Sequence, residues 1–450
     1  MKTELGPKPT GAVPPGARSR GPEVLGITSY QWLVLFAAWL GWGFDVFDGL
    51  LFNYVAPICV PDLLGLSPDA VADPEVRARV TRIVGWMTSA LLVGWGTGGI
   101  VFGYLTDRLG RARTLLLTML VYAGATAACA FATDLWVLGA LRFVASLGIG
   151  GEWAAGASLV AEVVPEKRRV FAGSLLYTSA PLGLFLATFV NDLFTKRIDW
   201  LAANPSLSWR AVFLTGLVPA FLALWVRRSV AEPESWTAVR RASDEVGYAE
   251  LFRREHRAAT LGGLGLCVVT LLTWWSCNAF MPLVASFLAS TDGIDRAAYV
   301  THSAVMFNLG GLVGTLLTIP GGAHLRRRTM FALYFAGGAI FLWLTFGLDL
   351  SAATRMWLLF PVGICIFGVV GAFSYYLPEL FPTRLRGSGS GFCFNAGRYL
   401  AARGPTVVAH AAAIAPTPMD AIKWVALLPA LGLLVIPFVR ETNPRRSPPA

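Results

Sequence analysis

Long apolar runs recur from one end of this 450-residue chain to the other, and they constrain its fold more than any other feature. A helix that crosses a bilayer needs about 20 predominantly apolar residues. Only 14% of the residues are charged, whereas an average soluble domain has about 25%. The runs therefore predict an all-α membrane protein with twelve transmembrane helices, at residues 31–60, 83–106, 113–132, 135–163, 169–193, 209–227, 259–289, 297–319, 329–347, 354–381, 386–412 and 419–439.

Basic residues set the expected orientation of these helices. They cluster in alternate connections, and membrane proteins keep arginine and lysine preferentially on the cytoplasmic side. The connection at 61–82 runs against this pattern, but the other clusters agree and place both chain termini in the cytoplasm. The agreeing clusters are Arg108, Arg111 and Arg113; Lys167, Arg168 and Arg169; Arg253, Arg254 and Arg257; Arg326, Arg327 and Arg328; Arg384 and Arg386; and Arg445 and Arg446.

The net charge of +10 follows from the same connections. A nucleic-acid-binding protein gathers its basic residues in one patch. Here they are spread over many helix ends, so the expected partner is the lipid bilayer and not a nucleic acid. Six cysteines and four histidines are scattered singly, without the spacing of a disulfide framework or a metal site. No metal and no cofactor are expected.

Polar segments divide the chain into five parts. Residues 1–30 are rich in proline and glycine, and we expect them to form a disordered cytoplasmic tail. The longest polar break between helices, 228–258, is expected to be a cytoplasmic linker. It separates a six-helix bundle at 31–227 from a second one at 259–440, and residues 441–450 form a short cytoplasmic tail.

The two halves carry related sequences at the same place. The stretches "AEVVPEKRR" (161–169) and "PELFPTRLR" (378–386) both read E-x-x-P-x-x-x-R. Glu162 and Glu379 stand 217 residues apart, which is about half the chain. Each copy ends the fourth helix of its half on the expected cytoplasmic side. An internal repeat of this size suits a transporter built from two related bundles.

The stretch "GYLTDRLGRAR" (103–113), between the second and third helices, is the most specific motif in the chain. An ordinary basic loop would explain its arginines but not Asp107 or the paired glycines. The motif resembles the cytoplasmic-loop signature of the major facilitator superfamily, which implies two six-helix bundles around a central substrate site. The resemblance and the repeat assign a cytoplasmic gate to Gly103, Asp107, Arg108, Gly110, Arg111, Glu162, Arg169, Glu379 and Arg386.

Charge complementarity gives this gate a physical mechanism. Asp107 stands at a helix end and can face the positive N-terminus of another helix. Arg108 and Arg111 can pair with Glu162 or Glu379, and exposed ion pairs are individually worth about 0–1 kcal/mol. Contacts this weak suit a gate that opens and closes repeatedly.

Two charged residues are expected at membrane depth in the fourth helix. The stretch "RFVASLGIGGEW" (142–153) begins with Arg142 and carries Glu152. A charge at the bilayer centre costs at least about 2.5–3.5 kcal/mol, so each side chain needs a partner or a function. The stretch resembles the fourth helix of organic-acid proton symporters of the superfamily, which carry sialate, aromatic acids or metabolites.

A further arginine is expected near mid-membrane in the eleventh helix. The stretch "GFCFNAGRYLAARGP" (391–405) resembles the same helix in those symporters and contains Arg398. A guanidinium is a planar fork that can contact both oxygens of a carboxylate. The resemblance therefore assigns Arg398, together with Arg142 and Asn395, to binding of a carboxylate substrate. The alternative is a structural arginine that pairs with an acid across the bundle.

Two aspartates stand in the apolar first helix, in "GFDVFDG" (43–49). Asp45 and Asp48 are three residues apart and so share one helix face. Two like charges this close resist simultaneous ionisation, and burial favours the neutral carboxyl. One of them, or Glu152, is therefore expected to carry a coupled proton. The segment resembles the Asp-Gly-x-Asp motif of aromatic-acid symporters, with Val46 in place of the glycine; pore-lining acids without a proton role are the alternative.

Three further residues fall in the middle of helices and carry polar groups. Trp275, Asn278 and Tyr376 are expected to line the central cavity and to contact the substrate.

The residues and the resemblance together predict a proton-coupled symporter that imports a small organic acid by alternating access. The expected location is a plasma membrane, specifically a bacterial inner membrane, and the monomer is expected to be functional. Nothing in the sequence supports an enzyme. Two alternatives are a carrier of a neutral solute such as a sugar, and a nutrient sensor that binds its ligand without transporting it.

Overall fold

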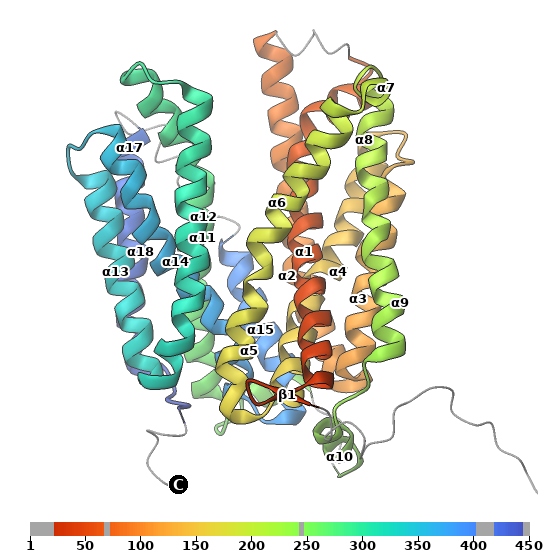
Figure 1. The fold of residues 1–450 in the computed structure, drawn as a ribbon, viewed down its shortest axis with the longest axis vertical. Helices are drawn as coiled ribbons and strands as arrows, with labels where there is room; N and C mark the ends of the chain where they lie inside the picture. Colours follow the sequence, from red (N-terminus) through yellow and green to blue (C-terminus); the bar gives the residue numbers. More distant parts are fainter. Residues whose placement is uncertain (1–21, 67–72, 243–246, 402–417, 444–450) are drawn as a thin grey trace, which may run out of the picture.

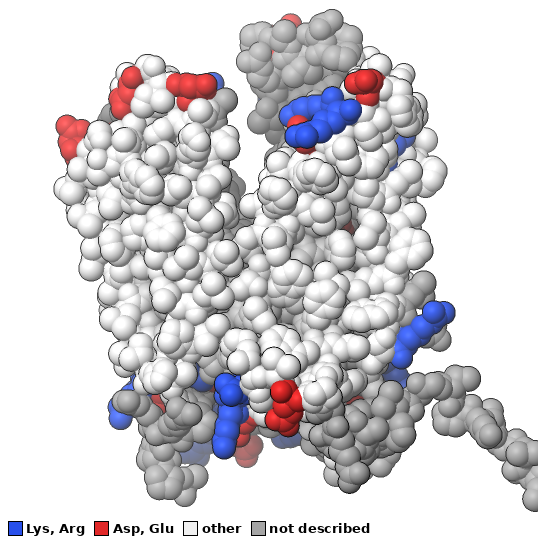
Figure 2. Space-filling view, viewed as in Figure 1, with Lys and Arg blue, Asp and Glu red and all other residues white. Residues whose placement is uncertain are grey.

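The computed structural model describes residues 22–66, 73–242, 247–401 and 418–443, and the description below is limited to them. Two helical bundles stand side by side (Figure 1). They are joined at the end where β1 (Glu23–Val24) and α10 (Glu234–Ala242) lie, which we call the closed end. At the opposite end, which we call the open end, a notch separates the described parts of the two bundles (Figure 2).

The helices fall into two sets, one for each bundle, with a connection between them that also contains helix. The N-terminal bundle comprises α1 (Ser29–Leu63), α2 (Pro74–Leu109), α3 (Arg111–Cys129), α4 (Leu135–Val163), α5 (Arg169–Tyr177), α6 (Ser179–Asp192), α7 (Asp199–Ala202), α8 (Pro205–Leu214) and α9 (Val218–Ser229). The connection holds α10 (Glu234–Ala242) and the 3-10 helix η6 (Tyr248–Phe252). The C-terminal bundle comprises α11 (Arg257–Thr291), α12 (Arg296–His324), α13 (Arg327–Gly347), α14 (Ala352–Leu380), α15 (Arg386–Ala401), α17 (Pro418–Ile422) and α18 (Leu427–Val435).

The predicted all-α membrane fold is confirmed. Within the described ranges, ten helical spans are long and apolar enough to cross a membrane. The shorter apolar run Lys423–Phe438 and the helix α15 fill the two remaining predicted places. The predicted continuation of the eleventh helix over 402–412 lies outside the described residues, as do positions 1–21 and 444–450 of the predicted tails.

Several boundaries differ from those predicted. α2 begins at Pro74, inside the segment 61–82 that was expected to be a polar connection, because Asp73 caps its N-terminus by accepting from the Glu75 N–H at 2.7 Å. The predicted fifth helix is divided at Thr178 into α5 and α6. The Thr178 hydroxyl donates to the Leu175 carbonyl at 2.7 Å.

Part of the predicted N-terminal tail is ordered. Residues 22–28 include a hairpin of β1 (Glu23–Val24) and β2 (Ile27–Thr28), whose turn uses positive φ angles at Leu25 and Gly26. Ile27 is fully buried, and Thr28 caps α1 in a capping box with Gln31. The buried apolar side chain and the cap explain why this segment is structured although its composition resembles a tail.

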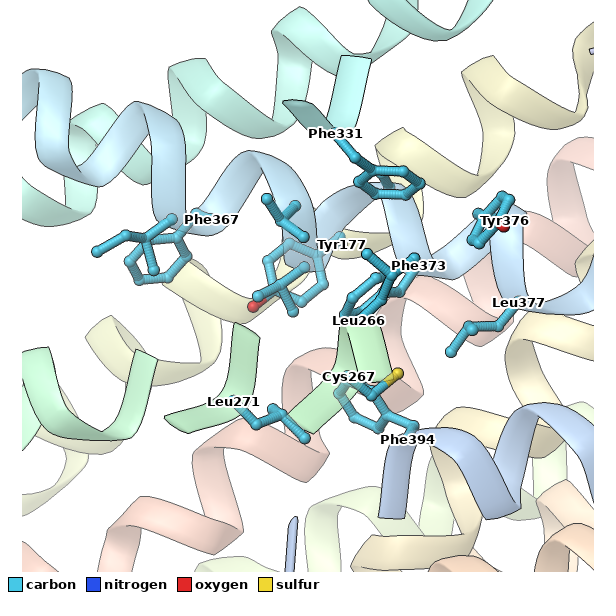
Figure 3. Close-up of a cluster of buried hydrophobic side chains, with 14 of the residues drawn as sticks. Tyr177, Leu266, Cys267, Leu271, Phe331, Phe367, Phe373, Tyr376, Leu377 and Phe394 are labelled. Carbon is cyan, nitrogen blue, oxygen red and sulfur yellow. The ribbon is translucent and has the colours of Figure 1, made fainter. Parts of the chain in front are cut away.

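The largest apolar cluster among the described residues contains side chains from both bundles. Figure 3 shows part of it, where Tyr177 of α5 lies among side chains of α11, α14 and α15. Between the bundles, α2 packs against α15 and α5 packs against α14. These helix contacts join the two bundles, while a notch separates their described parts at the open end (Figure 2).

Candidate functional site

Three ionisable side chains lie buried in the middle of the molecule on three different helices. Asp45 of α1, Glu152 of α4 and Arg398 of α15 have exposed fractions of 0%, 1% and 5%. Asp45 lies within electrostatic range of Glu152 and Arg398 as well as of Asp48. The sequence groups Asp45 only with Asp48, and the structure adds Glu152 and Arg398.

Gly41 makes this arrangement possible. A Cβ atom at this position would overlap the carboxylate of Glu152, so only glycine lets the Glu152 side chain lie directly against α1. Gly41 is one helical turn before Asp45, which places the two acids side by side along α1. The sequence shows the glycine but not the acid that packs on it.

Several polar atoms of these three side chains lack partners. Both carboxylate oxygens of Asp45, Oε2 of Glu152 and Nε of Arg398 form no hydrogen bond with any residue that the structure describes. A buried polar group left without a partner costs about 1–3 kcal/mol. The cluster is therefore suited to groups that come and go, such as a proton on a carboxyl or an anion on the guanidinium.

Arg398 is surrounded by one amide and two aromatic rings. Its Nη1 donates to Oδ1 of Asn395 at 2.7 Å. Its guanidinium carbon lies 4.3 Å from the ring centroid of Trp95 and 4.9 Å from that of Phe394. No carboxylate of the described chain forms an ion pair with it, although Asp45 lies within electrostatic range.

Arg142, also predicted to bind substrate, is already engaged. Its Nη1 forms an ion pair with Oδ1 of Asp48 at 2.8 Å, and its Nη2 donates to the Asp48 carbonyl at 2.9 Å. The Thr126 hydroxyl donates to the same carboxylate at 2.6 Å. This cluster ties α1, α3 and α4 together inside the N-terminal bundle. Arg142 thus has the kind of acid partner that the structural alternative foresaw for Arg398.

The three mid-helix residues expected in the cavity have different surroundings. Tyr376 is fully buried in the C-terminal bundle, where it packs on Phe331 and donates to the Arg440 carbonyl at 3.0 Å (Figure 3). This contradicts a cavity position for Tyr376. The Asn278 amide donates back to its own helix at 2.8 Å. Trp275 is half-buried and packs against apolar clusters of both bundles.

The predicted gate residues gather at the closed end. Asp107, in the last turn of α2, accepts hydrogen bonds from the N–H groups of Gly387 at 3.0 Å and Ser388 at 2.7 Å. Both belong to the first turn of α15, so Asp107 faces the positive N-terminus of a helix in the other bundle. This is the kind of partner that the sequence predicts for it.

Glu162 is the centre of a charge network in this gate. Arg111 of the same bundle pairs with it at 2.9 Å, and Arg386 of the other bundle pairs with it at 3.2 Å. The side chains of Arg111 and Glu162 are fully buried, so the low energy expected for exposed pairs does not apply. Removing one partner of a buried pair destabilises by about 3–5 kcal/mol, because a charge is left uncompensated.

The second half repeats part of this network. Arg327 pairs with Glu379 at 3.1 Å, as Arg111 pairs with Glu162. The repeat is not complete, because Arg169 lies within electrostatic range of Glu379 without an ion pair among the described residues. Arg108, expected to pair with a glutamate, lies over the ring of Tyr104, with 4.5 Å from its guanidinium carbon to the ring centroid.

Two glutamates that the sequence analysis missed cap helices of this gate. Glu232 accepts from the N–H groups of Arg111 at 2.7 Å and Arg113 at 2.9 Å, at the N-terminus of α3. Glu441 accepts from the Arg327 N–H at 3.1 Å, at the equivalent end of α13. Each glutamate follows the last helix of its bundle, and this shared position is the signal that could have revealed them. Gly110, which has a φ of +115°, leaves the space that the Glu232 carboxylate fills.

Glycines let the two bundles meet at the gate. A Cβ atom on Gly103 of α2 would lie 3.0 Å from the Gly387 carbonyl oxygen and 3.2 Å from Cα of Gly391, both on α15. Replacing Gly103 with leucine should therefore push the closed end apart. The measurement is maleimide labelling of a cysteine placed at Ser388, which is only 1% exposed; labelling should rise in the leucine variant.

The matched control for this prediction is Gly124→Leu. An added Cβ at Gly124 on α3 meets no atom within 4 Å. Labelling in this variant should equal that of the unmutated protein. Equal labelling in the Gly103 variant as well would contradict a gate held by close glycine packing.

Comparisons with known proteins bear on the family and the fold of this chain. The sequence pattern of the Major Facilitator Superfamily matches residues 31–405. A sialic acid transporter of Escherichia coli is 26% identical over 370 residues, covering 81% of this chain and 83% of the relative. A gentisate transporter of Corynebacterium glutamicum is 26% identical over 394 residues, covering 84% of this chain and 81% of the relative.

Among solved structures, the proton:xylose symporter XylE bound to 6-bromo-6-deoxy-D-glucose matches with a TM-score of 0.73. The match covers 92% of this chain and 97% of that one at 17% identity. An identity this low supports a shared fold and says nothing about the substrate.

Proposed function

Because the chain belongs to the Major Facilitator Superfamily, we propose that it is a proton-coupled symporter that imports a small organic acid by alternating access. The family and its relatives are multi-pass membrane transporters and not enzymes. The substrate class, the coupling ion and the direction of transport are proposed from the buried site and the gate.

The proposed substrate class, an organic anion, rests on Arg398. It is a buried cation without a carboxylate partner in the described chain, between the two bundles and beside Asn395. A carboxylate can satisfy it through two parallel charge-assisted hydrogen bonds. The relatives named for sialic acid and gentisate point to the same class of substrate, since both compounds are organic acids. A neutral solute would leave the buried charge uncompensated.

The proposed binding site of the coupled proton is the carboxyl pair Asp45 and Glu152. Two carboxyls close together in a buried place disfavour double ionisation, so the pair tends to hold one proton. An incoming substrate anion adds a second negative charge beside the singly protonated pair and favours retention of that proton. When the acid leaves on the other side, its negative charge is removed and the carboxyl pair releases the proton. Asp48, neutralised by Arg142, has no such freedom.

The closed end indicates which side of the membrane each opening faces. We assign it to the cytoplasm because Arg111, Arg327 and Arg386 of the basic connections lie there, and arginine and lysine prefer that side. The structure then corresponds to a state open to the outside. Opening the gate would require Asp107 to leave α15 and Arg386 to leave Glu162.

Uptake into proteoliposomes with an imposed pH gradient tests the proposal. The panel contains sialic acid, gentisate, lactate and glucose, and an internal dye reports pH. We expect uptake of at least one acid together with inward proton movement, and no uptake of glucose. Uptake of glucose alone, or acid uptake without proton movement, would contradict the symporter.

A further inference from the structure

The charge of Arg398 presents a physical problem that the proposed function does not solve. Its side chain is 5% exposed, and a buried guanidinium normally needs an acid nearby. An acid paired with it would neutralise the charge that a substrate anion requires. In the described chain Asp45 lies within electrostatic range of the guanidinium but forms no ion pair with it. The direct contacts of the guanidinium are one neutral hydrogen-bond partner, Asn395, and the faces of two aromatic rings.

The two rings come from different bundles. Phe394 precedes Arg398 on α15 and stacks on Trp153 of α4, with ring centroids 4.3 Å apart. Trp95 belongs to α2 of the N-terminal bundle and approaches the guanidinium to 4.3 Å. Indole offers the strongest cation–π attraction among side chains, and this attraction grows when the pair is removed from water.

The same stretch of α2 also positions Asn395. Gly99 is one turn after Trp95, and a Cβ atom at Gly99 would overlap the Asn395 side chain. The Asn395 amide donates to the Gly391 carbonyl at 2.9 Å, which fixes its Oδ1 toward Arg398. α2 thus holds Arg398 twice, once through the Trp95 face and once through the amide that Gly99 accommodates.

We propose that Trp95 is a positioning residue for the substrate site: its indole face stabilises the guanidinium of Arg398 without neutralising it, so that the arginine remains free to bind an anion. An aromatic face lowers the cost of burying the cation but accepts none of its N–H groups. The remaining donors of the guanidinium are therefore available to a carboxylate. The inference rests on the proposed role of Arg398 in anion binding.

The test is a series of substitutions at Trp95 in the full-length protein. Binding constants for sialic acid and gentisate are measured by calorimetry in detergent, and uptake kinetics in proteoliposomes. Trp95→Leu should weaken acid binding about tenfold, with the maximum uptake rate changed by no more than about twofold. Trp95→Tyr and Trp95→Phe should fall between the leucine variant and the unmutated protein, because their rings retain a weaker cation–π attraction.

Two controls separate this inference from a general loss of packing and from the proposed function. Trp86→Leu removes a 57% exposed indole from the same helix and should leave acid binding unchanged. If Arg398→Ala abolishes acid binding while all three Trp95 variants bind as well as the unmutated protein, Trp95 has no positioning role. The same holds if binding falls equally in all three variants. If the unmutated protein binds neither acid, or Arg398→Ala binds as well as it does, the proposed function fails and the inference fails with it.

Discussion

Replacing Arg398 with alanine should reduce acid uptake by at least about 30-fold, because truncating one partner of a buried, hydrogen-bonded charge pair costs roughly 2–5 kcal/mol. In the variant the substrate carboxylate would enter a buried place that still contains Asp45 and Glu152 and no compensating cation. The measurement is the initial rate of uptake of sialic acid and gentisate at equal amounts of reconstituted protein. Arg398→Lys should retain part of the activity, since it keeps the charge but loses the planar fork.

Arg355 offers a matched control for the loss of a buried arginine. It lies in the C-terminal bundle, is 6% exposed, and donates to the carbonyls of Leu350 and Thr345 at 2.8 Å and 2.7 Å. Arg355→Ala should lower the unfolding temperature and leave the affinity for the acid unchanged. Uptake by Arg398→Ala at the rate of the unmutated protein would contradict binding of the acid by Arg398.

The fold could be predicted from the sequence because it depends on segment length and composition. A bilayer demands runs of about 20 apolar residues, and that requirement is visible without any knowledge of contacts. The predicted helix and tail boundaries are wrong where a local hydrogen bond or a single buried side chain decides them. The cap at Asp73 extends α2, and the buried Ile27 orders a hairpin within a segment that composition assigns to a tail.

The candidate site could be predicted only in part, because its residue types are visible and its partners are not. The sequence places both Arg142 and Arg398 at membrane depth and assigns Arg398, together with Arg142, to the substrate. Only the fold shows that Arg142 faces Asp48 inside one bundle, whereas Arg398 stands between the bundles without an acid partner among the described residues.

Spacing along one helix was a poor guide to which acids act together. Asp45 and Asp48 share a helix face in the sequence, but a helix inside a bundle has neighbours on every side. Asp48 points toward α3 and α4, where Thr126 and Arg142 bind it. Asp45 is grouped with Glu152, 107 positions later in the chain, because Gly41 leaves room for that side chain.

Replacing Asp45 with asparagine should abolish acid accumulation driven by a pH gradient while preserving exchange of acid across the membrane. Asparagine has nearly the same shape as aspartic acid, but it cannot bind or release a proton. With one proton per acid, a pH step of one unit supports about a tenfold concentration gradient of the acid, since 1.4 kcal/mol corresponds to a factor of ten. The Asp45→Asn protein should reach a gradient near one under the same conditions.

Counterflow separates loss of coupling from loss of transport. Vesicles loaded with unlabelled acid should still take up labelled acid through the Asp45→Asn variant, because exchange needs the substrate site and the gate but no net proton movement. Asp48→Asn is the contrasting variant, since it removes the counter-ion of Arg142 and should lower the unfolding temperature while leaving coupling intact in the protein that folds. If Asp45→Asn still accumulates acid with inward proton movement, the proton is carried elsewhere. The neighbouring Glu152 is then the remaining carboxyl of the buried pair, and Glu152→Gln should show the uncoupled behaviour.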